Sequence, residues 1–365
     1  MKFRLILAAA ALLCACTAQP PRDLPRSEPS EQLASAFRTF NDSLQASFSN
    51  PQDYMRMVNL HSIMVIKDGK VVLEQWYRGH TPDSAHIMFS VSKTFTATAV
   101  GLAIADGKMS LDDKVTDYFS DVPLPAVYNP CNATVKDLLM MAGGHDTDPT
   151  MAVLDVDARA MKSSLKEGTN VPSVFFTHPF VHEPGTHFCY NSLGTYILSY
   201  IVQKVTGECI LDYLTTRIFE PLGIDKPYWE ADNMGVNCGG WGLHLKTEDM
   251  AKFGQLLLQK GKWYGRQLIP AEWVEEMGKA HIECAPAQMS PEEADALLPP
   301  SENDWRQGYG YQTWRNKVEG FRADGAGGQN IIVLPQKNAV VITTAWTSNA
   351  QRELDFVWNY IYPFL

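Results

Sequence analysis

Two residues near position 90 place a nucleophile and a base at helical spacing. Ser90 and Lys93 stand three residues apart, at the start of a segment whose remaining polar residues are Ser92 and three threonines. This composition from Val91 to Ala105 predicts a buried helix. Residues three apart share a helix face, so the Lys93 amine can hydrogen-bond the Ser90 hydroxyl and raise its nucleophilicity. NH groups at a helix start also favour developing negative charge.

The Ser-x-x-Lys spacing has low specificity when taken alone. The chain contains a second copy at Ser163–Lys166, in a polar stretch that continues into Glu167 and Gly168. A serine that caps a helix, beside a lysine that extends to solvent, produces the same pattern without chemistry. The interpretation of Ser90 as a nucleophile therefore depends on further residues that complete a site.

Tyr190 is the first such residue. It lies in the segment Glu183–Ser192, just ahead of a helix predicted from Leu193 to Val205. In a turn before a helix, the tyrosine hydroxyl can point into a cleft. A neighbouring ammonium lowers a tyrosine pKa from its usual value near 10, so Tyr190 is expected to be partly ionised beside Lys93. A tyrosine simply buried beneath the helix is the alternative.

A glycine-rich segment supplies the third element. Phe321–Gln329 contains Asp324-Gly325-Ala326-Gly327-Gly328 and leads into a strand predicted for Asn330–Leu334. Small residues on an edge strand let a substrate approach closely, and their backbone NH groups can bind an oxyanion. A glycine-rich turn without chemistry is the alternative.

Strands are predicted at both ends of the domain. Ser62–Ile66 and Val71–Tyr77 flank Asp68-Gly69, which supplies the positive φ angles of a two-residue hairpin turn. Asn330–Leu334 and Ala339–Thr344 predict a second hairpin. The sequence therefore predicts an α+β fold, with one antiparallel sheet built from both termini and flanked by helices, including one within Ser348–Tyr362.

The region between these strands, about residues 90–277, predicts a mainly helical insertion. Thr134 and Asp137 have capping-box spacing before one helix, and Gly207 follows the helix Leu193–Val205. Thr247–Asp249 precedes a third apolar helix. These helices are the elements that must position the residues named above.

The N-terminus is typical of an export signal. Lys2 and Arg4 precede the apolar run Leu5–Leu13, so residues 1–15 are predicted to be a signal peptide. Leu13-Cys14-Ala15-Cys16 resembles a bacterial lipobox with Cys16 as the lipid-bearing residue. Residues 16–50 are expected to be a lipid-anchored tether and lead-in, and residues 51–365 the folded domain. The predicted location is therefore the periplasm-facing or outer surface of a membrane; an ordinary cleaved signal is the alternative.

Composition excludes several classes of partner. The formal net charge is −10 and no segment concentrates Lys and Arg, which disfavours nucleic-acid binding. Beyond residue 15 no apolar run is long enough to span a bilayer, so membrane contact is expected through the lipid anchor alone. The remaining cysteines have no CxxC spacing, and Pro179 separates the pair His178 and His182, so no metal or cofactor is expected. These cysteines are Cys131, Cys189, Cys209, Cys238 and Cys284.

Together these segments resemble the serine β-lactamase and penicillin-binding-protein-like hydrolases. The nearest branch is the class C-related one, which includes esterases and 6-aminohexanoate-oligomer hydrolases. The resemblance runs from about Asp53 to the C-terminus. Connecting phrases that support it are Asp106–Asp113, Pro221–Ile224, Gly239–Leu243 and Gly254–Leu258.

The resemblance implies a role for each site residue. Ser90 would form an acyl-enzyme, Lys93 would activate it, and Tyr190 would act as general base and acid. The backbone NH groups of Ser90 and Ala326 would form the oxyanion hole. Which of Lys93 and Tyr190 takes the serine proton stays open, as it does for lactamase-type sites generally.

Two departures from the family pattern bear on substrate. Lactamase and peptidase members usually have Tyr-x-Asn, whereas Ser192 is the third residue here. They also have Lys-Thr-Gly or His-Thr-Gly on the edge strand, where this chain has Ala323-Asp324-Gly325. The missing cation normally binds a substrate carboxylate, and Arg322 should point to the opposite face of the strand. Ser192, Asp324 and Gly325 are expected to contact the substrate.

These departures favour a serine hydrolase that cleaves neutral esters or amides. One alternative is a D-Ala-D-Ala carboxypeptidase or β-lactamase, for which penicillin acylation is the sign. A second alternative is a non-catalytic penicillin-binding-like receptor lipoprotein. The presence of Ser90, Lys93 and Tyr190 together disfavours the receptor.

Overall fold

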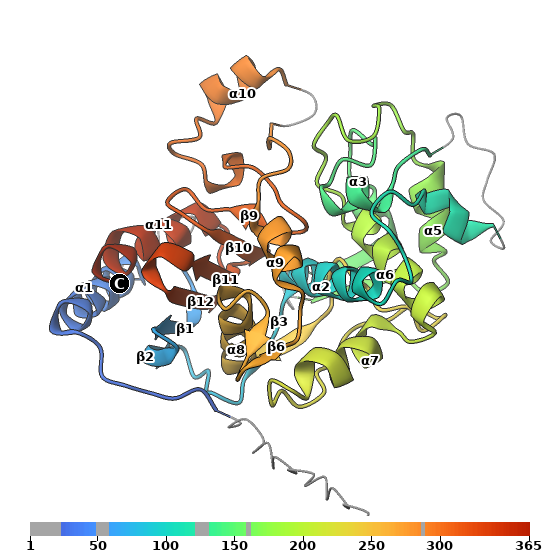
Figure 1. Cartoon of the computed structure of the whole chain (residues 1–365). Helices are drawn as coiled ribbons and strands as arrows, with labels where there is room; N and C mark the ends of the chain where they lie inside the picture. Colours follow the sequence, from blue (N-terminus) through green and yellow to red (C-terminus); the bar gives the residue numbers. More distant parts are fainter. Residues whose placement is uncertain (1–22, 49–57, 121–130, 158–161, 286–288) are drawn as a thin grey trace, which may run out of the picture.

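The computed structural model describes residues 23–48, 58–120, 131–157, 162–285 and 289–365 (Figure 1). The predicted signal peptide, residues 1–15, and the predicted lipidation site Cys16 lie outside the described residues. Within the described ranges, no helix combines the length and the hydrophobicity that crossing a membrane requires.

A six-stranded antiparallel sheet forms the larger half of the fold, with the strand order β2-β1-β12-β11-β10-β9. The first hairpin turns at Asp68 and Gly69, whose φ angles of 51° and 75° are the positive values that the sequence predicts. The predicted fold class is confirmed, because strands from both termini pair at the centre of this sheet. The strands are β1 (Leu60–Lys67), β2 (Lys70–Trp76), β9 (Trp314–Arg315), β10 (Phe321–Gly325), β11 (Gln329–Leu334) and β12 (Ala339–Ala345).

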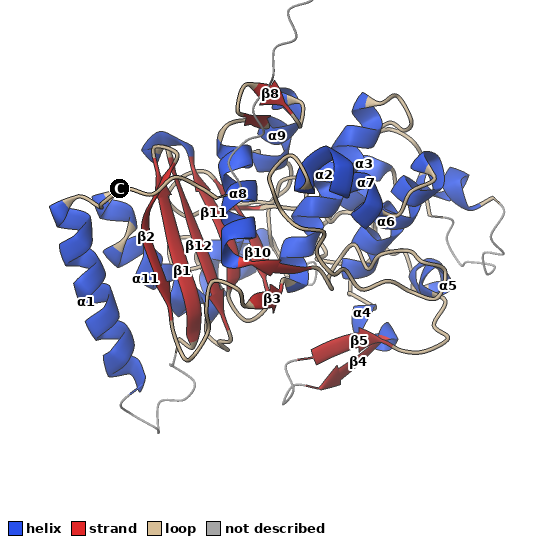
Figure 2. Cartoon of the chain, turned by 90° about the horizontal axis from the view of Figure 1, so that it is seen from below, coloured by secondary structure: helices blue, strands red, loops and turns tan. Residues whose placement is uncertain are grey.

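Helices cover both faces of the sheet (Figure 2). Helices α1 (Glu31–Phe48) and α11 (Ala350–Tyr360) pack on one face, against a cluster that includes Val65 and Val341. Helix α8 (Thr247–Leu258) packs on the other face, against β1, β11 and β12. The central strands are apolar on both sides, as burial between two helical layers requires.

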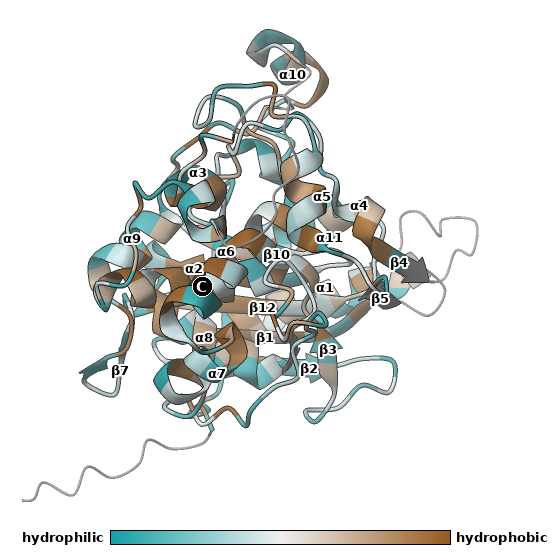
Figure 3. Cartoon of the chain, turned by 90° about the vertical axis from the view of Figure 1, so that its right-hand side faces the viewer, coloured by the Kyte–Doolittle hydropathy of each residue, from teal (hydrophilic) through white to brown (hydrophobic). Residues whose placement is uncertain are grey.

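A group of helices beside the sheet carries most of the site. Helix α2 (Ser92–Ala105) is buried on nearly every side and packs mainly against α6 (Ser192–Thr206). Figure 3 shows apolar residues concentrated in α2, α8 and the central strands. The predicted capping box is present, because the Thr134 side chain accepts a hydrogen bond from the Asp137 NH. Gly207 ends α6 with a φ angle of 78°. The remaining helices of this region are α3 (Val135–Leu139), α4 (Thr150–Val153), α5 (Val171–Thr177) and α7 (Ile210–Leu214).

The region 90–277 is not wholly separate from the sheet. Helix α8 belongs to it by sequence but covers the sheet, and the short strand β6 (His244–Lys246) pairs with β3 (Ala85–Ile87). The other small elements are the hairpin β4 (Leu154–Asp157) and β5 (Lys162–Leu165), the hairpin β7 (Lys262–Trp263) and β8 (Arg266–Gln267), and helices α9 (Ala271–Gly278) and α10 (Pro291–Leu297).

Residues 24–48 are part of the folded domain, which corrects their assignment to a tether. Arg26 forms a parallel bridge with Val71 and ion pairs with Glu74 and Glu248 at 3.1 and 2.9 Å. Helix α1 buries Phe40 against α11. The Pro- and Ser-rich composition before residue 32 does not predict this packing, because residues 24–48 contact parts of the chain that are distant in sequence.

The five described cysteines are all free thiols. Four of them are buried, and Cys209 is partly exposed. Their role is therefore packing, as the absence of CxxC spacing predicts.

Candidate active site

Ser90 lies at a sharp corner of the backbone. It is the middle residue of the 3-10 turn Phe89–Val91, which runs directly into α2. Phe89 has φ of 44°, a left-handed conformation that is costly for a bulky residue. Packing of the Phe89 ring on Trp346, with centroids 5.9 Å apart, holds this conformation. The strained corner fixes Ser90 at the start of the helix.

Lys93 is the most constrained polar side chain of the site. It is 1% exposed, and its amine contacts three oxygen atoms that carry no formal charge. Nζ lies 2.9 Å from Ser90 Oγ, 2.9 Å from Ser192 Oγ and 2.8 Å from the Gly240 carbonyl oxygen. The predicted contact between Lys93 and Ser90 is present.

Burial without a paired carboxylate lowers the pKa of Lys93. Desolvation takes it from 10.5 to about 7, and the carboxylate of the exposed Asp148 opposes this shift only weakly. Near neutral pH the amine is therefore divided between its charged and neutral forms. The neutral amine carries a lone pair. It is therefore the form of Lys93 that can accept a proton from Ser90.

Tyr190 lies on the other side of the nucleophile. Its hydroxyl hydrogen-bonds Ser90, Lys93 Nζ is 4.8 Å from its ring centroid, and Trp314 stacks on the ring at 5.5 Å. Burial raises the pKa of Tyr190 above its usual value, and the hydrogen bond to Ser90 opposes this only in part. The expectation of a partly ionised Tyr190 is therefore wrong, because burial disfavours the phenolate more than the hydrogen bond to Ser90 stabilises it.

Asn191 fixes the segment that carries Tyr190 and Ser192. Its side-chain oxygen caps α6 by accepting from the Gly194 NH at 3.2 Å, and its amide nitrogen lies 2.8 Å from a ring nitrogen of His145. Asn191 thus fixes this loop, and its neighbours Tyr190 and Ser192 face Ser90 and Lys93.

Two glycines permit the close approaches that the site needs. A Cβ on Gly240 would lie 2.6 Å from the Ser192 carbonyl oxygen, so glycine is needed for the Gly240 carbonyl oxygen to reach Lys93. A Cβ on Gly325 would lie 2.3 Å from the Met88 carbonyl oxygen, at the nucleophile corner. The first contact brings the Gly240 backbone against the start of α6, and the second brings the Gly325 backbone against the corner that precedes α2.

A cavity of about 580 Å³ opens over Ser90. Ser192 and Ala326 also line it, which places the two residues of the expected oxyanion hole at one cavity. The wall is largely apolar, and Arg78 is the one lining residue with a formal charge among those that the structure describes. The described residues that line the cavity are Asn59, Arg78, Phe89, Ser90, Thr150, Met151, Leu154, Ser192, Gly240, Trp241, Ala326, Gly327, Trp346, Thr347 and Ser348.

Asp324 and Gly325 lie behind this wall and are not among its lining residues. The Arg322 guanidinium, which is fully buried, donates from Nε to the Asp324 carboxylate at 2.8 Å. Burial raises the pKa of Asp324, and the Arg322 charge counteracts it. Arg322 and Asp324 therefore neutralise each other, and neither takes the place of the missing edge-strand cation.

Sequence reasoning did not identify Gly240 as a site residue. Gly240 acts through its carbonyl oxygen, which every residue has, and only the repeated glycines of Gly239–Gly242 mark the place. Trp314 lies just ahead of the edge strand, a position from which the sequence allows either a pocket role or a core role, and the structure stacks it on Tyr190.

Replacement of Lys93 by Met should remove a pH-dependent cost to stability. In the wild type, the unfolded chain binds a proton at Lys93 below about pH 10.5, whereas the folded chain binds it only below about pH 7. The unfolded state therefore holds more protons in this window, so Lys93 makes stability rise with pH, by up to about 1.4 kcal/mol per pH unit. Urea unfolding at pH 7 and pH 9 checks this.

We expect the Lys93→Met variant to be the more stable protein at pH 7, by about 1 kcal/mol or more. Its advantage should shrink at pH 9. An equal pH dependence in the two proteins would contradict a buried Lys93 amine whose pKa is lowered.

Comparison with known proteins identifies the family of the chain. The family model described as Beta-lactamase matches residues 60–358. The 6-aminohexanoate-dimer hydrolase of Paenarthrobacter ureafaciens is 24% identical over 305 residues, which cover 82% of this chain and 76% of that protein.

Solved structures share the fold. An octameric penicillin-binding protein homologue from Pyrococcus abyssi superposes with a TM-score of 0.66 at 21% identity, covering 89% of this chain and 77% of that one. A family VIII carboxylesterase superposes with a TM-score of 0.65 at 15% identity, covering 93% and 99%. With most of its length matched by the family model and a buried lysine beside a serine at the cavity, the chain belongs to the β-lactamase family of serine hydrolases.

Proposed function

We propose that this chain hydrolyses a neutral ester or amide through an acyl-enzyme on Ser90, with Lys93 as the base and Tyr190 as a neutral proton donor. The observation that carries the proposal is the Lys93 amine, buried among uncharged oxygens with a pKa of about 7 and 2.9 Å from Ser90 Oγ. A lysine in this state is a proton acceptor at neutral pH.

Acylation begins when the Ser90 hydroxyl passes its proton to Lys93 Nζ while Oγ forms a bond to the substrate carbonyl carbon. The carbonyl electron pair moves to its oxygen, which the backbone NH groups of Ser90 and Ala326 stabilise. As the carbon–leaving-group bond breaks, Tyr190 donates its hydroxyl proton to the departing oxygen or nitrogen. Tyr190 then recovers a proton from Lys93, which returns to the neutral amine.

Deacylation repeats these transfers with water as the nucleophile. The water gives a proton to Lys93 by way of Tyr190 as its oxygen attacks the acyl carbon. The bond to Ser90 Oγ then breaks, and the protonated amine returns the proton to Oγ. The products are a carboxylic acid and the enzyme in its starting state.

The cavity wall favours an apolar acyl group. Phe89, Met151, Leu154, Trp241 and Trp346 line it. The edge strand offers no free cation beside the scissile bond, because Ala323 stands at the position of the family lysine and Arg322 is paired with Asp324. Among the relatives, one is named for an amide-bonded dimer and another is a carboxylesterase, which supports both bond types as candidates.

Labelling with a fluorophosphonate tests the nucleophile. Intact mass of the wild-type domain should increase by one adduct, because an activated serine attacks phosphorus, and the Ser90→Ala variant should gain none. Ser163→Ala is the matched control, since Ser163 begins the second Ser-x-x-Lys of the sequence. Absence of an adduct on folded wild-type protein would overturn the mechanism and favour the receptor alternative.

The pH profile of kcat/KM separates the roles of Lys93 and Tyr190. Because the neutral amine is the active form, kcat/KM should fall tenfold per unit below an apparent pKa of about 7. Tyr190→Phe should reduce kcat by about 10²–10⁴-fold yet keep this acid limb. Loss of the acid limb in Tyr190→Phe would assign the titration to tyrosine and contradict Lys93 as the base.

A matched ester pair tests the substrate class. We expect p-nitrophenyl butyrate to exceed the hemisuccinate p-nitrophenyl ester in kcat/KM by about tenfold or more, since the second ester adds a carboxylate to an apolar cavity. The preference should persist in Arg78→Gln. A wild-type preference for the hemisuccinate that Arg78→Gln abolishes would overturn the neutral-substrate assignment, and stable acylation by benzylpenicillin would favour the peptidase alternative.

A further inference from the structure

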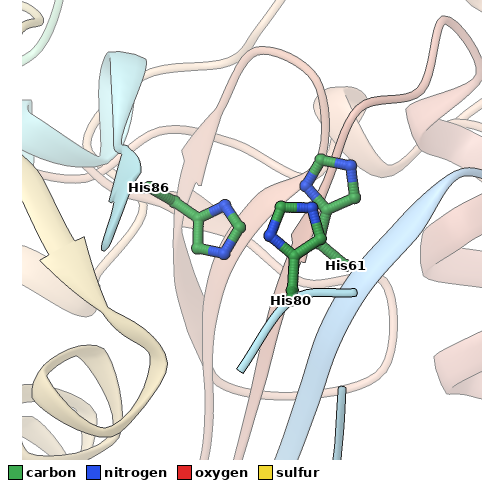
Figure 4. A group of neighbouring side chains, drawn as sticks. All are labelled: His61, His80 and His86. Carbon is green, nitrogen blue, oxygen red and sulfur yellow. The ribbon is translucent and has the colours of Figure 1, made fainter. Parts of the chain in front are cut away.

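Three histidines from separate parts of the chain converge beside the active site (Figure 4). His61 comes from β1, His80 from the loop after β2, and His86 from β3. Their ring centroids are 4.1 Å apart for His61 and His80, 4.9 Å for His80 and His86, and 5.4 Å for His61 and His86. One nitrogen from each ring lies within 4.8 Å of the other two.

Two of these rings carry buried nitrogens without a hydrogen-bond partner among the described residues. His61 is 6% exposed and His86 is 9% exposed, and the atoms concerned are His61 Nδ1 and His86 Nε2. A buried polar atom left unpaired costs about 1–3 kcal/mol. Two such atoms on neighbouring rings call for a ligand that both can bind.

The surroundings favour a cation that accepts lone pairs. All three histidines line a cavity of about 570 Å³, in which Glu230 and His244 also take part. A neutral imidazole offers such a cation the lone pair of one ring nitrogen.

The backbone holds the three positions firmly. His61 is an extra residue in β1, because the pairing with β12 shifts register between Leu60 and Ser62. Its carbonyl oxygen accepts from the Tyr77 NH at 2.9 Å, and the His80 NH donates to the Tyr77 carbonyl oxygen at 3.0 Å. His86 lies opposite Leu245 in the β3–β6 pair. A bulge that redirects a side chain is a recurrent device next to functional sites.

We propose that His61, His80 and His86 bind a divalent transition-metal ion of the zinc class, with water from the cavity as the fourth ligand. Tetrahedral zinc with nitrogen ligands at about 2.0–2.1 Å requires the nitrogens to be about 3.4 Å apart. The present spacing of up to 4.8 Å closes to this value by rotation of the imidazole rings about their side-chain torsions. The stacked pair, His61 and His80, must turn the most.

The proposed ion is structural and does not touch the substrate. Phe89 and Trp346 line both this cavity and the one over Ser90, so the two cavities share a wall. His86 precedes Ser90 by four residues. A bound ion would therefore tie β1 and the loop after β2 to the segment that positions the nucleophile. This proposal is independent of the mechanism given above.

Metal titration of the purified domain, first stripped with a chelator, tests the site. Zinc sulfate should bind at one ion per chain and raise the melting temperature, and cobalt(II) should give the visible bands of a tetrahedral nitrogen-ligated ion. His80→Ala should weaken binding by at least about 100-fold and abolish the thermal shift, because it removes one of three ligands.

Two controls make the outcome decisive. His187→Ala removes an exposed imidazole from a different stacked pair, His182 and His187, and should leave zinc binding unchanged. His80→Gln replaces His80→Ala if circular dichroism shows that the alanine variant is misfolded. Wild-type affinity retained in the His80 variant, a thiolate-to-cobalt charge-transfer band, or no stoichiometric binding by the wild type would each overturn the proposal.

Discussion

The buried amine of Lys93 is the interaction on which the site depends. An ammonium taken out of water without a carboxylate partner is strongly destabilised, so the fold must supply dipoles in place of charge. It does so with Ser90, Ser192 and the Gly240 carbonyl, which come from three separate segments. Each segment is placed by a different device: a strained corner at Phe89, a capped helix at Asn191 and a pair of glycines at Gly239 and Gly240.

The use of dipoles in place of a carboxylate has a chemical consequence. A neighbouring aspartate would keep Lys93 protonated, so the amine could not act as a base. Hydroxyl and carbonyl groups stabilise the ammonium less, so the pKa of Lys93 is lowered. The same low-dielectric surroundings keep Tyr190 protonated. Burial thus lowers the pKa of Lys93 and raises the pKa of Tyr190, so the same environment provides both a base and an acid.

Much of this arrangement was predictable from the sequence, for identifiable reasons. The hairpin at Asp68-Gly69 and the cap at Gly207 are local signals that tertiary contacts did not override. The Ser90–Lys93 contact follows from helical periodicity. The ionisation of Tyr190 was not predictable, because it depends on how deeply the fold buries two side chains that are 97 residues apart in sequence. The histidine cluster likewise has no spacing signal, since a bulge and two strand pairings bring it together.

The pairing of β1 with β12 also constrains how the chain folds. Ser62 and Thr344, which hydrogen-bond through their side chains at the centre of the sheet, are 282 residues apart in sequence. The β1–β12 pair therefore cannot form until Thr344 and its neighbours have been synthesised. Until then the apolar strand β1 can pair only with β2, and a two-stranded hairpin is only marginally stable. Such non-local pairing predicts slow folding, through a stage that requires protection from aggregation.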